Sequence, residues 1–546
     1  MTRRDDGAST RFDRTTLAVV GLTAVALVAR LVGLGTRAFH WDEARVGYWT
    51  LRYLDSGAFE YRPVAGGTFL PLVNRHVFAL LGANDFTGRL VVALVGGLLP
   101  LVALLYRDRL RDDETVAFAL VLAVEPVLLY YSRFARGELL LAAFSLLAVG
   151  CFLRVVDVGG RRYLYVGVVA VGLLLTTSGF AVVTLLCWTL AVFLTFDHLR
   201  VRGDGNPVGT AERAWRGFVS RATPLARSLF LLLGVLLFFY APRAGDTDEV
   251  GLWNLSTLPA TVESAFLGSF RKFWAVRIDY RRTNGHELLP YIVEYVELLV
   301  VLSLPVVVLA VGAFLADRYL TGGRRPLLHF FSFWAAVSLL AVPMLAEQFA
   351  PWLAVHTVVA LTLPAAVGLA ALVRVGAAGL ERDRAARVGA VALVCVVLSA
   401  HVGGVVATNV YGSPGPDDDL AQYAQPSQPL EPMLENASAA MARTDGPDVV
   451  YVGEAFYTLD ADSDLQPPVS DAWGNRLPLP WYFERIDARQ TSVAAPDELE
   501  MVDSEPAVVV VEDEERSQVA RQLEGYESTE YELGLWNREV YVFVLQ

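Results

Sequence analysis

The sequence predicts an all-α protein that crosses a membrane about eleven times and ends in a small α/β domain outside the membrane. Three observations support this fold class. The 546 residues are 54% hydrophobic, and the apolar residues are gathered into long runs up to residue 408. Residues 409–546 have a net charge of −21, whereas the rest of the chain has a net charge of +8. Short apolar segments that are typical of strands occur within the acidic part.

Eleven apolar runs are candidates for membrane helices, each of which needs roughly 20 residues to cross the hydrocarbon core. They cover residues 15–34, 88–106, 115–131, 138–155, 163–177, 179–196, 226–241, 291–316, 327–345, 351–374 and 388–408, all within a predicted membrane domain of 15–408. The first run is long, lacks a small-residue cleavage site and is followed by further runs. We therefore expect a retained helix rather than a cleaved signal peptide.

The positions of the arginines predict which side of the membrane each loop faces, because the cytoplasmic loops of membrane proteins are enriched in basic residues. With residues 1–14 placed in the cytoplasm, every even-numbered connection is cytoplasmic and contains arginines. The same orientation places two long loops, 35–87 and 242–290, outside the cell, together with the acidic C-terminal part. A functional site at a membrane surface is expected in such loops.

The acidic part divides into a Pro-rich linker, 409–432, and a domain, 433–546. Apolar runs predict the strands of this domain, and a terminal glycine marks the end of its helix. The predicted strands are 448–452, 507–512, 531–535 and 539–545, and the predicted helix is 514–525. Such a domain can bind a partner or cap a site on the membrane part.

Composition excludes several classes of protein. The three cysteines lie far apart in apolar runs, so neither a zinc site nor a disulfide framework is expected. The acidic domain disfavours nucleic acid as a partner. Lys272 is the only lysine in the sequence. Together with the high acid content this indicates a halophile, because an acidic surface stays hydrated in concentrated salt.

The start of the first outside loop is the strongest candidate site. Asp42 and Glu43 follow a membrane helix closely, although carboxylates are costly near hydrocarbon. The aromatic residues of 44–54 predict a helix that lies in the membrane interface. We interpret Asp42 and Glu43 as candidate catalytic residues. The structural alternative is that Asp42 only stabilises the N-terminus of this helix.

A second candidate is the turn between the third and fourth predicted spans. It contains Arg133, Arg136 and Glu138. An arginine can hold a phosphate through two parallel hydrogen bonds. The alternative is that these arginines only extend to the membrane surface beside tyrosine anchors.

Two further outside segments carry candidate phosphate ligands. Lys272 and Arg277 belong to a basic cluster on the otherwise acidic outside, and its anionic partner is either lipid headgroups or a substrate phosphate. Trp352 and His356 lie at the start of the tenth predicted span, after a proline. The structural alternative is a helix-initiating proline with an interfacial tryptophan.

The order of these motifs resembles the GT-C glycosyltransferases, such as the protein O-mannosyltransferases and the lipid A aminoarabinose transferase. Three segments within roughly 15–160 carry the resemblance: Asp42-Glu43, the run Pro71, His76, Gly82, Asp85, Phe86, Gly88 and Arg89, and Ser132 to Glu138. Three more are similar to an archaeal, flippase-activity-associated branch: Asn284 and His286 with Tyr291 and Glu297, Pro351 to Leu353, and Leu477 to Tyr482. The sequence departs from this branch at Gln348, where a lysine is expected with a slightly shorter spacing.

The resemblance implies a GT-C-like membrane domain and a polyprenyl- or dolichyl-phosphate sugar donor. An inverting hexosyl transfer to a glycan or protein acceptor would take place on the outer face. Asp42 would take the proton of the acceptor hydroxyl, and Glu43 would orient Asp42 or the acceptor. Positive charge would stabilise the leaving phosphate. The residues expected around the substrate and its phosphate are Arg133, Arg136, Glu138, Lys272, Arg277, His286, Trp352 and His356.

Two alternatives accompany this hypothesis. A divalent metal held by His40, Asp42 and Glu43 would replace the arginines, although no cofactor is expected. A non-catalytic, flippase-associated component that handles lipid-linked sugars would keep a lipid groove without needing Asp42. Secondary transport is disfavoured, because the sequence shows no internal repeat and its acidic residues avoid the middle of the spans.

Overall fold

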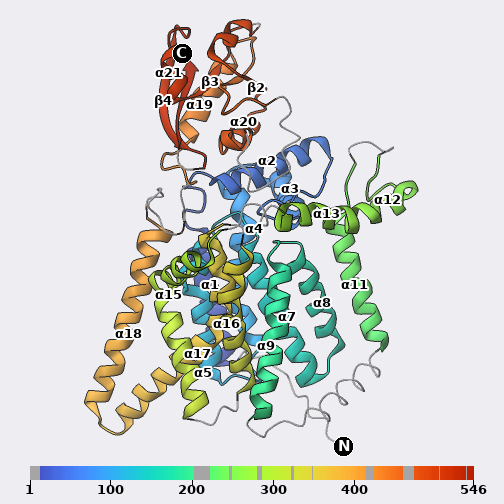
Figure 1. The fold of residues 1–546 in the computed structure, drawn as a ribbon. Coiled ribbons are helices and arrows are strands. Elements are labelled where there is room, and N and C mark those ends of the chain that lie inside the picture. The colour runs from blue at the N-terminus through green and yellow to red at the C-terminus, as the bar shows by residue number, and fades with distance from the viewer. Residues whose placement is uncertain are drawn as a thin grey trace, which may run out of the picture.

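The computed structural model describes residues 13–201, 222–244, 249–279, 286–320, 325–346, 348–412, 420, 424–458, 472–502, 504–535 and 538–546. Long helices stand side by side in a bundle, and a sheet domain stands at one end of it (Figure 1). We call this C-terminal part, residues 431–546, the tail domain. Two helices, α2 (Trp41–Ser56) and α3 (Phe69–Leu81), lie between the bundle and the tail domain.

Helices occupy the positions of all eleven predicted spans. They are α1 (Arg14–Leu31), α4 (Asp85–Leu98) with η1 (Leu99–Leu105), α5 (Asp112–Val124) with α6 (Pro126–Tyr131), α7 (Glu138–Val158), α8 (Arg161–Leu175), α9 (Ala181–Val201), α11 (Ala222–Tyr240), α15 (Leu288–Tyr319), α16 (Pro326–Leu345), α17 (Ala354–Glu381) and α18 (Ala385–Val405). Within the described ranges, nine helices are long and apolar enough to cross a membrane. The protein is therefore a multi-pass membrane protein.

Two of the predicted spans are not among these nine. The third is interrupted at Pro126, which has no amide hydrogen to donate to the helix, so α5 ends at Val124. Glu125 then caps α6 by accepting a hydrogen bond from the Leu128 amide at 2.7 Å. The fifth, α8, has only 15 residues. The sequence located both segments correctly but did not indicate the break between α5 and α6.

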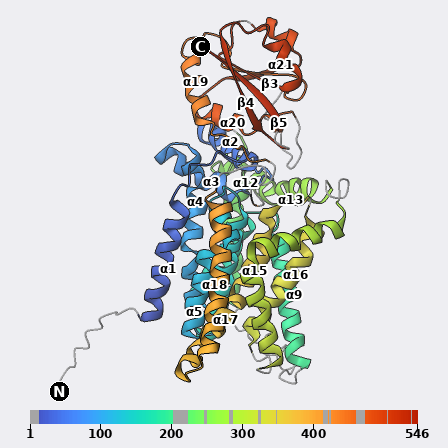
Figure 2. The same cartoon turned by 90° about the vertical axis from the view of Figure 1, so that its left-hand side faces the viewer.

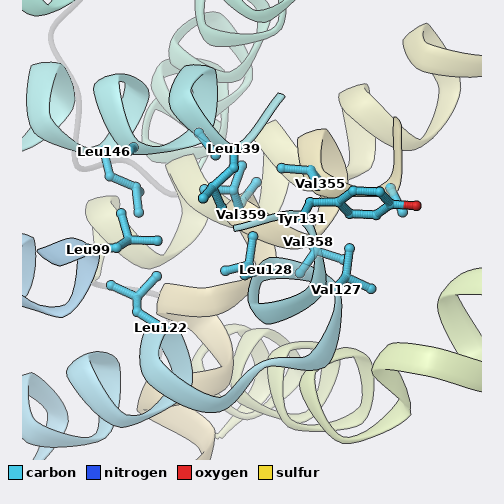
Figure 3. Close-up of a cluster of buried hydrophobic side chains, with 14 of the residues drawn as sticks. Leu99, Leu122, Val127, Leu128, Tyr131, Leu139, Leu146, Val355, Val358 and Val359 are labelled. Carbon is cyan, nitrogen blue, oxygen red and sulfur yellow. The ribbon is translucent and has the colours of Figure 1, made fainter. Parts of the chain in front are cut away.

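The centre of the bundle lies where α6, α7 and α17 meet. Figure 3 shows side chains of these helices, among them Leu128, Leu139 and Val358, packed against one another; all three are buried. In contrast, α18 has no buried residue and stands at the left-hand edge of the bundle in Figure 1. The packed centre fixes the ends of α6 and α7, and therefore also the turn that joins them.

Ion pairs hold the end of the bundle that lies away from the tail domain. Arg109 donates to Asp157 at 2.9 Å, and Arg325 donates to the two oxygens of Glu114 at 2.9 and 2.6 Å. These residues lie in or beside the described parts of the basic connections, at the end of the bundle opposite the tail domain in both views (Figures 1 and 2). The two long loops and the tail domain share the other end, as the predicted topology requires.

The first long loop, 35–87, is largely helical. α2 begins after His40, whose side chain accepts a hydrogen bond from the Asp42 amide, and ends at Gly57, which has a φ of +68°. The predicted helix over 44–54 is thus present. Its position in the membrane interface stays a prediction, and its aromatic residues are buried inside the protein: Tyr48 and Trp49 contact Trp473 of the tail domain, and Tyr53 packs on Phe59.

The second long loop carries two short helices, α12 (Leu258–Glu263) and α13 (Ser269–Trp274), which extend across the same end of the bundle (Figure 1). Exposed apolar side chains in this loop include Trp253, which precedes α12, and Phe270 and Trp274 of α13. Large exposed aromatics at the end of a membrane bundle are typical of contact with lipid headgroups.

The tail domain contains a five-stranded sheet with the order β2-β1-β3-β5-β4. Its elements are α19 (Glu431–Met441), β1 (Val449–Val452), α20 (Leu479–Glu484), β2 (Gln490–Val493), β3 (Val508–Glu512), α21 (Asp513–Val519), β4 (Tyr526–Leu533) and β5 (Arg538–Leu545). The first three strands in that order are parallel, and β5 and β4 are antiparallel to their neighbours. β1 and β3 are buried on both faces, which explains their continuous runs of valine.

The sequence found four of the five strands. It missed β2, because an edge strand with the sequence Gln-Thr-Ser-Val has no apolar run. It also missed α19, which begins at the end of the predicted linker, and α20. The predicted helix 514–525 is shorter than expected and ends at Val519. The sequence also places a turn at 536–537, between the last two predicted strands, and these two positions lie outside the described residues.

Candidate functional site

A cleft lies between the bundle and the tail domain, and the space inside it that the centre of a water molecule can occupy measures about 80 Å³. Its walls come from the start of α2, the turn between α6 and α7, the turn between α8 and α9, and the segment before α17. The side chains that matter for its chemistry are those of His40, Asp42, Arg136, Glu138, Arg277, Gln348 and Trp352. Leu535 of the tail domain also lines it. Both acidic and basic side chains therefore meet in one cleft at the end of the bundle.

Arg136 connects two carboxylates in this cleft. Its guanidinium pairs with Asp42 and donates hydrogen bonds to Glu138 at 3.1 and 3.3 Å. The guanidinium also lies 3.8 Å from the centre of the Trp352 ring. Although burial alone lowers the pKa of Arg136, the charges of Asp42 and Glu138 raise it, so this residue is a cation at every working pH. Asp42 is partly exposed, so a ligand in the cleft can reach it.

A glycine allows this arrangement. A Cβ atom on Gly137 would lie 1.9 Å from the carbonyl oxygen of Thr177, in the turn between α8 and α9. The Gly137 amide donates to the Ala65 carbonyl at 3.2 Å. The backbone of the Arg136 turn is therefore pressed against two other segments, which leaves the Arg136 side chain little freedom to move away from Asp42.

Glu43, next to Asp42, is completely buried and lies outside the cleft. Arg89 donates to its two oxygens at 2.7 and 2.6 Å, and the amides of Ala135 and His40 donate to them at 2.7 and 3.0 Å. Burial alone would raise the pKa of the Glu43 carboxyl, but the charge and hydrogen bonds of Arg89 lower it to about 2. Glu43 thus joins the start of α2 to the Arg136 turn and to α4.

His40 precedes α2 and is buried. Its Nδ1 accepts a hydrogen bond from the Asp42 amide at 3.1 Å, and burial lowers the pKa of its imidazole to about 4. The three residues of the alternative metal site are thus directed to different partners: His40 Nδ1 to a backbone amide, Glu43 to Arg89, and Asp42 to Arg136. This arrangement does not favour a metal, and the described residues contain no cluster of His, Cys, Asp and Glu that could hold one.

The tail domain holds the segment before Asp42 in place. The Tyr482 hydroxyl accepts a hydrogen bond from the Phe39 amide at 2.9 Å and donates one to Asp85 at 2.7 Å. Trp481 donates to the other Asp85 oxygen at 2.9 Å, and its ring stacks on Phe39 at 4.9 Å. Trp41 donates to the Gly474 carbonyl at 2.7 Å. The residues on either side of His40 are therefore bonded to the tail domain.

We expect Tyr482→Phe to loosen this contact, because the Phe39 amide and one Asp85 oxygen lose their partner inside the protein. The cost is about 1–3 kcal/mol. Hydrogen exchange read by mass spectrometry should show faster exchange around Phe39, together with a lower unfolding temperature. Tyr526→Phe is the matched control, since that hydroxyl donates to the Pro506 carbonyl within the tail domain. If the backbone amides near Phe39 exchanged at the same rate in both variants, this role of Tyr482 would be contradicted.

The structure separates the two arginines that the sequence grouped together. Arg133 does not line the cleft. Its guanidinium donates to the carbonyls of Arg30, Val32 and Gly33 at 3.1, 2.5 and 3.0 Å. Arg30 lies in the last turn of α1, and Val32 and Gly33 follow the end of this helix. These carbonyls have no helical partners of their own, so Arg133 caps α1 rather than facing a substrate.

The basic cluster of the second long loop is divided in the same way. Arg277 lines the cleft and donates to the Pro63 carbonyl at 3.3 Å. Lys272 pairs with Glu60 and donates to the Tyr61 carbonyl at 3.4 Å, away from the cleft. The neighbouring arginines at positions 281 and 282 lie outside the described residues.

The last group of predicted residues is also divided. Trp352 lines the cleft, as does Gln348, which replaces the expected lysine. His356 is buried one helical turn further on, and its ring stacks at 5.1 Å on Phe180, which itself lines the cleft. His286 lies elsewhere, with its Nε2 2.9 Å from the carbonyl oxygen of Pro343.

The sequence analysis proposed no function for three residues that support the site. Arg89 and Asp85 belong to the run that resembles the glycosyltransferases, and Tyr482 belongs to the motif at 477–482. Their presence in family motifs was a signal, but their partners lie 46 to 443 residues away along the chain. Only the folded structure shows that they support the start of α2.

Two families match parts of the chain. Residues 430–545 match the C-terminal domain of the Agl23 flippase-associated protein, which corresponds to the tail domain. Residues 67–203 match the dolichyl-phosphate-mannose-protein mannosyltransferases, a stretch that includes Arg136 and Glu138. No curated protein sequence matches the chain.

Solved structures resemble almost the whole chain. ArnT from Cupriavidus metallidurans, bound to undecaprenyl phosphate, matches with a TM-score of 0.57 and 17% identity, over 96% of this chain and 98% of that one. The oligosaccharyltransferase of Archaeoglobus fulgidus in its apo form matches with a TM-score of 0.53 and 13% identity, over 95% and 73% of the two chains. The same organism's AglB, in complex with an inhibitory peptide and a dolichol-phosphate, matches with a TM-score of 0.51 and 12% identity, over 95% and 73%.

Proposed function

Because this chain is a membrane protein with the GT-C glycosyltransferase fold and the tail domain of the Agl23 branch, we propose that it transfers a sugar from a polyprenyl- or dolichyl-phosphate donor to an acceptor hydroxyl or amide. One observation carries the proposal. A carboxylate, Asp42, and a cation, Arg136, lie in contact in a cleft at the end of the membrane bundle. These are the two charges that such a transfer needs, a base for the acceptor and a counter-charge for the leaving phosphate.

The proposed reaction is a single displacement. The acceptor attacks the anomeric carbon of the sugar while Asp42 takes the proton of the acceptor. The bond between the anomeric carbon and the phosphate oxygen breaks, and the lipid phosphate leaves with its electron pair. Arg136 and Arg277 stabilise the added negative charge. Attack on the side opposite to the leaving phosphate inverts the anomeric centre, and a hexose is the proposed sugar.

Two observations support a lipid-phosphate donor. ArnT and AglB, whose fold this chain shares, were solved with undecaprenyl phosphate and with a dolichol-phosphate. In this chain the cleft opens at the end of the apolar bundle and is lined by Arg136, Arg277 and Trp352. A lipid phosphate that enters from the membrane surface can place its headgroup beside them while its chain stays among apolar side chains.

The orientation completes the proposal. The described parts of the basic connections lie at one end of the bundle, and the cleft and the tail domain lie at the other. The positive-inside rule therefore supports an outside position for the cleft. The acceptor is then a glycan or protein at the cell surface, as in archaeal surface-protein glycosylation. A tag after Gln546 should react with an impermeant reagent on intact cells, and a protected tag would reverse the orientation.

The decisive experiment is reconstitution. Purified protein in lipid nanodiscs, supplied with dolichyl-phosphate hexose and a surface-protein extract, should release dolichyl phosphate and add mass to the acceptor. Heat-denatured protein is the control. An intact donor after prolonged incubation, with both substrates shown to bind, would reject the transferase.

The name of the family that matches the tail domain supports a second candidate, a non-catalytic component associated with a flippase. This protein would bind the lipid-linked sugar and move or present it. Proteoliposomes that contain a fluorescent dolichyl-phosphate sugar distinguish the two functions. The second candidate predicts faster movement of the lipid between leaflets without any loss of its sugar.

The division of the basic cluster gives a direct test of donor binding. Arg277→Met should weaken the binding of dolichyl phosphate at least about tenfold, because a hydrogen bond to a charged group contributes about 1.5–3 kcal/mol. Lys272→Met is the matched control, since it removes a cation from the same loop but not from the cleft. Binding can be measured by native mass spectrometry of the protein in nanodiscs. Equal loss in both variants would indicate a general attraction to anionic lipid instead of a phosphate site.

A further inference from the structure

The imidazole of His40 has a defined tautomer. Its Nδ1 accepts the hydrogen bond from the Asp42 amide, so this nitrogen carries a lone pair. The imidazole is neutral at physiological pH, because burial lowers its pKa to about 4. The remaining proton is therefore on Nε2, and Nε2 is a hydrogen-bond donor and not an acceptor.

Among the described residues this donor has no acceptor. His40 Nε2 is buried and makes no hydrogen bond to any described residue. Buried polar groups without a partner are rare in folded proteins, and they often mark a place where a ligand binds. His40 lines the cleft together with Asp42, Arg136 and Trp352, and its ring lies 6.1 Å from the Trp352 ring and 5.1 Å from the Phe134 ring.

Capping α2 does not explain the choice of histidine. Serine, asparagine or aspartate accepts the same hydrogen bond from the helix and leaves no distal N–H group behind. A histidine provides two functions at once, an acceptor for the helix on one side of the ring and a donor on the other. Because none of the described residues accepts from this donor, a ligand in the cleft is the partner to test.

We propose that His40 is a substrate-binding residue, whose Nε2–H donates a hydrogen bond to an oxygen of the lipid-phosphate-sugar donor in the cleft. This inference rests on the proposed function. The shared chemistry of the ligand is an oxygen acceptor, supplied by the phosphate or by a sugar hydroxyl. Because His40 is uncharged, it directs this oxygen without competing with Arg136 for Asp42, and it ties ligand binding to the residue that holds the Asp42 amide.

Two substitutions separate the functions of the ring. In His40→Asn the amide oxygen takes the position of Nδ1, so the helix keeps its cap but loses the distal donor. In His40→Gln the terminal amide reaches the position of Nε2, so the distal donor is kept while the cap is lost. If His40 only caps the helix, His40→Asn should behave like the wild type and His40→Gln should be the impaired variant.

Binding of two probes to the full-length protein in nanodiscs tests the proposal, with dolichyl phosphate as one probe and dolichyl-phosphate hexose as the other. We expect His40→Asn to keep the unfolding temperature of the wild type and to bind the hexose-bearing lipid about tenfold more weakly. His40→Gln should unfold at a lower temperature but bind this lipid more tightly than His40→Asn does.

The probes also identify the atom that His40 contacts. Equal loss for both probes in His40→Asn assigns the contact to the phosphate, and loss for the hexose-bearing lipid alone assigns it to the sugar. Wild-type affinity of His40→Asn for both lipids would overturn the inference while leaving the proposed function intact. If the wild-type protein binds neither lipid, the proposed function itself fails.

Discussion

Replacing Asp42 with asparagine should lower the rate of sugar transfer by about 10²–10⁴-fold, the usual contribution of a general base. Asparagine has the shape of aspartate and also favours the first turn of a helix, so α2 should form as before. It cannot take a proton from the acceptor. The loss should therefore appear in kcat, whereas the binding of dolichyl phosphate should be retained or tightened, since Arg136 loses its partner Asp42.

The effect is measured as dolichyl phosphate released in single-turnover experiments with wild type and variant side by side. Asp55→Asn is the matched control, because Asp55 lies near the other end of α2 and does not line the cleft. In cells, the surface glycoproteins of an Asp42→Asn strain should resemble those of the gene deletion when compared by mass spectrometry. Normal glycans in the Asp42→Asn strain, together with altered glycans in the deletion, would favour the flippase-associated function.

Replacing Arg89 with methionine should destabilise the protein by about 3–5 kcal/mol, the usual cost of breaking a buried ion pair from one side. The Glu43 carboxylate would remain buried without its main counter-charge, and the link between α2 and α4 would be lost. A fluorescence-based unfolding curve in detergent should show a large fall in the midpoint. The double variant Glu43→Leu with Arg89→Met removes both charges and should recover much of this loss.

Arg109→Met provides the comparison at the other end of the bundle. Arg109 and Asp157 form a pair that is partly exposed to solvent, so its removal should change the midpoint little. If both single variants lowered the midpoint equally, the special importance of the buried pair would be refuted.

The buried pair of Glu43 and Arg89 also predicts how the stability of the protein changes in acid. The pKa of Glu43 is lowered from 4.5 in the unfolded chain to about 2 in the folded protein. Its contribution to stability is therefore fully present above about pH 4.5 and is lost as the pH falls towards 2. The difference in midpoint between the wild type and the double variant should shrink over this range.

Local signals in the sequence were sufficient for the overall architecture. Apolar runs located the membrane helices, because each must be apolar along its whole length to face lipid or the packed centre. Valine-rich runs located β1 and β3 for a similar reason. The halophilic habitat rests on composition alone and stays a prediction.

The candidate site could be predicted only in part. Asp42 and Arg136 were singled out because charged side chains are costly next to the hydrocarbon core. The directions of neighbouring side chains were not predictable. Arg133 and Arg136 are three residues apart, yet one caps α1 and the other pairs with Asp42. The direction of Arg133 depends on the carbonyls at the end of α1, and the backbone beside Arg136 depends on the close contact of Gly137 with Thr177. No local sequence pattern contains either contact.

The hydrogen bond between Phe39 and Tyr482 spans 443 residues, and this separation has a consequence for biogenesis. During synthesis the segment that carries Asp42 leaves the ribosome long before the tail domain exists. Until the tail domain has been made and has folded, the Phe39 amide and the Asp85 carboxylate lack the Tyr482 hydroxyl as a partner. Under the proposed function, we expect activity to appear only after the tail domain has folded, so that chains without it leave the lipid-linked sugar intact.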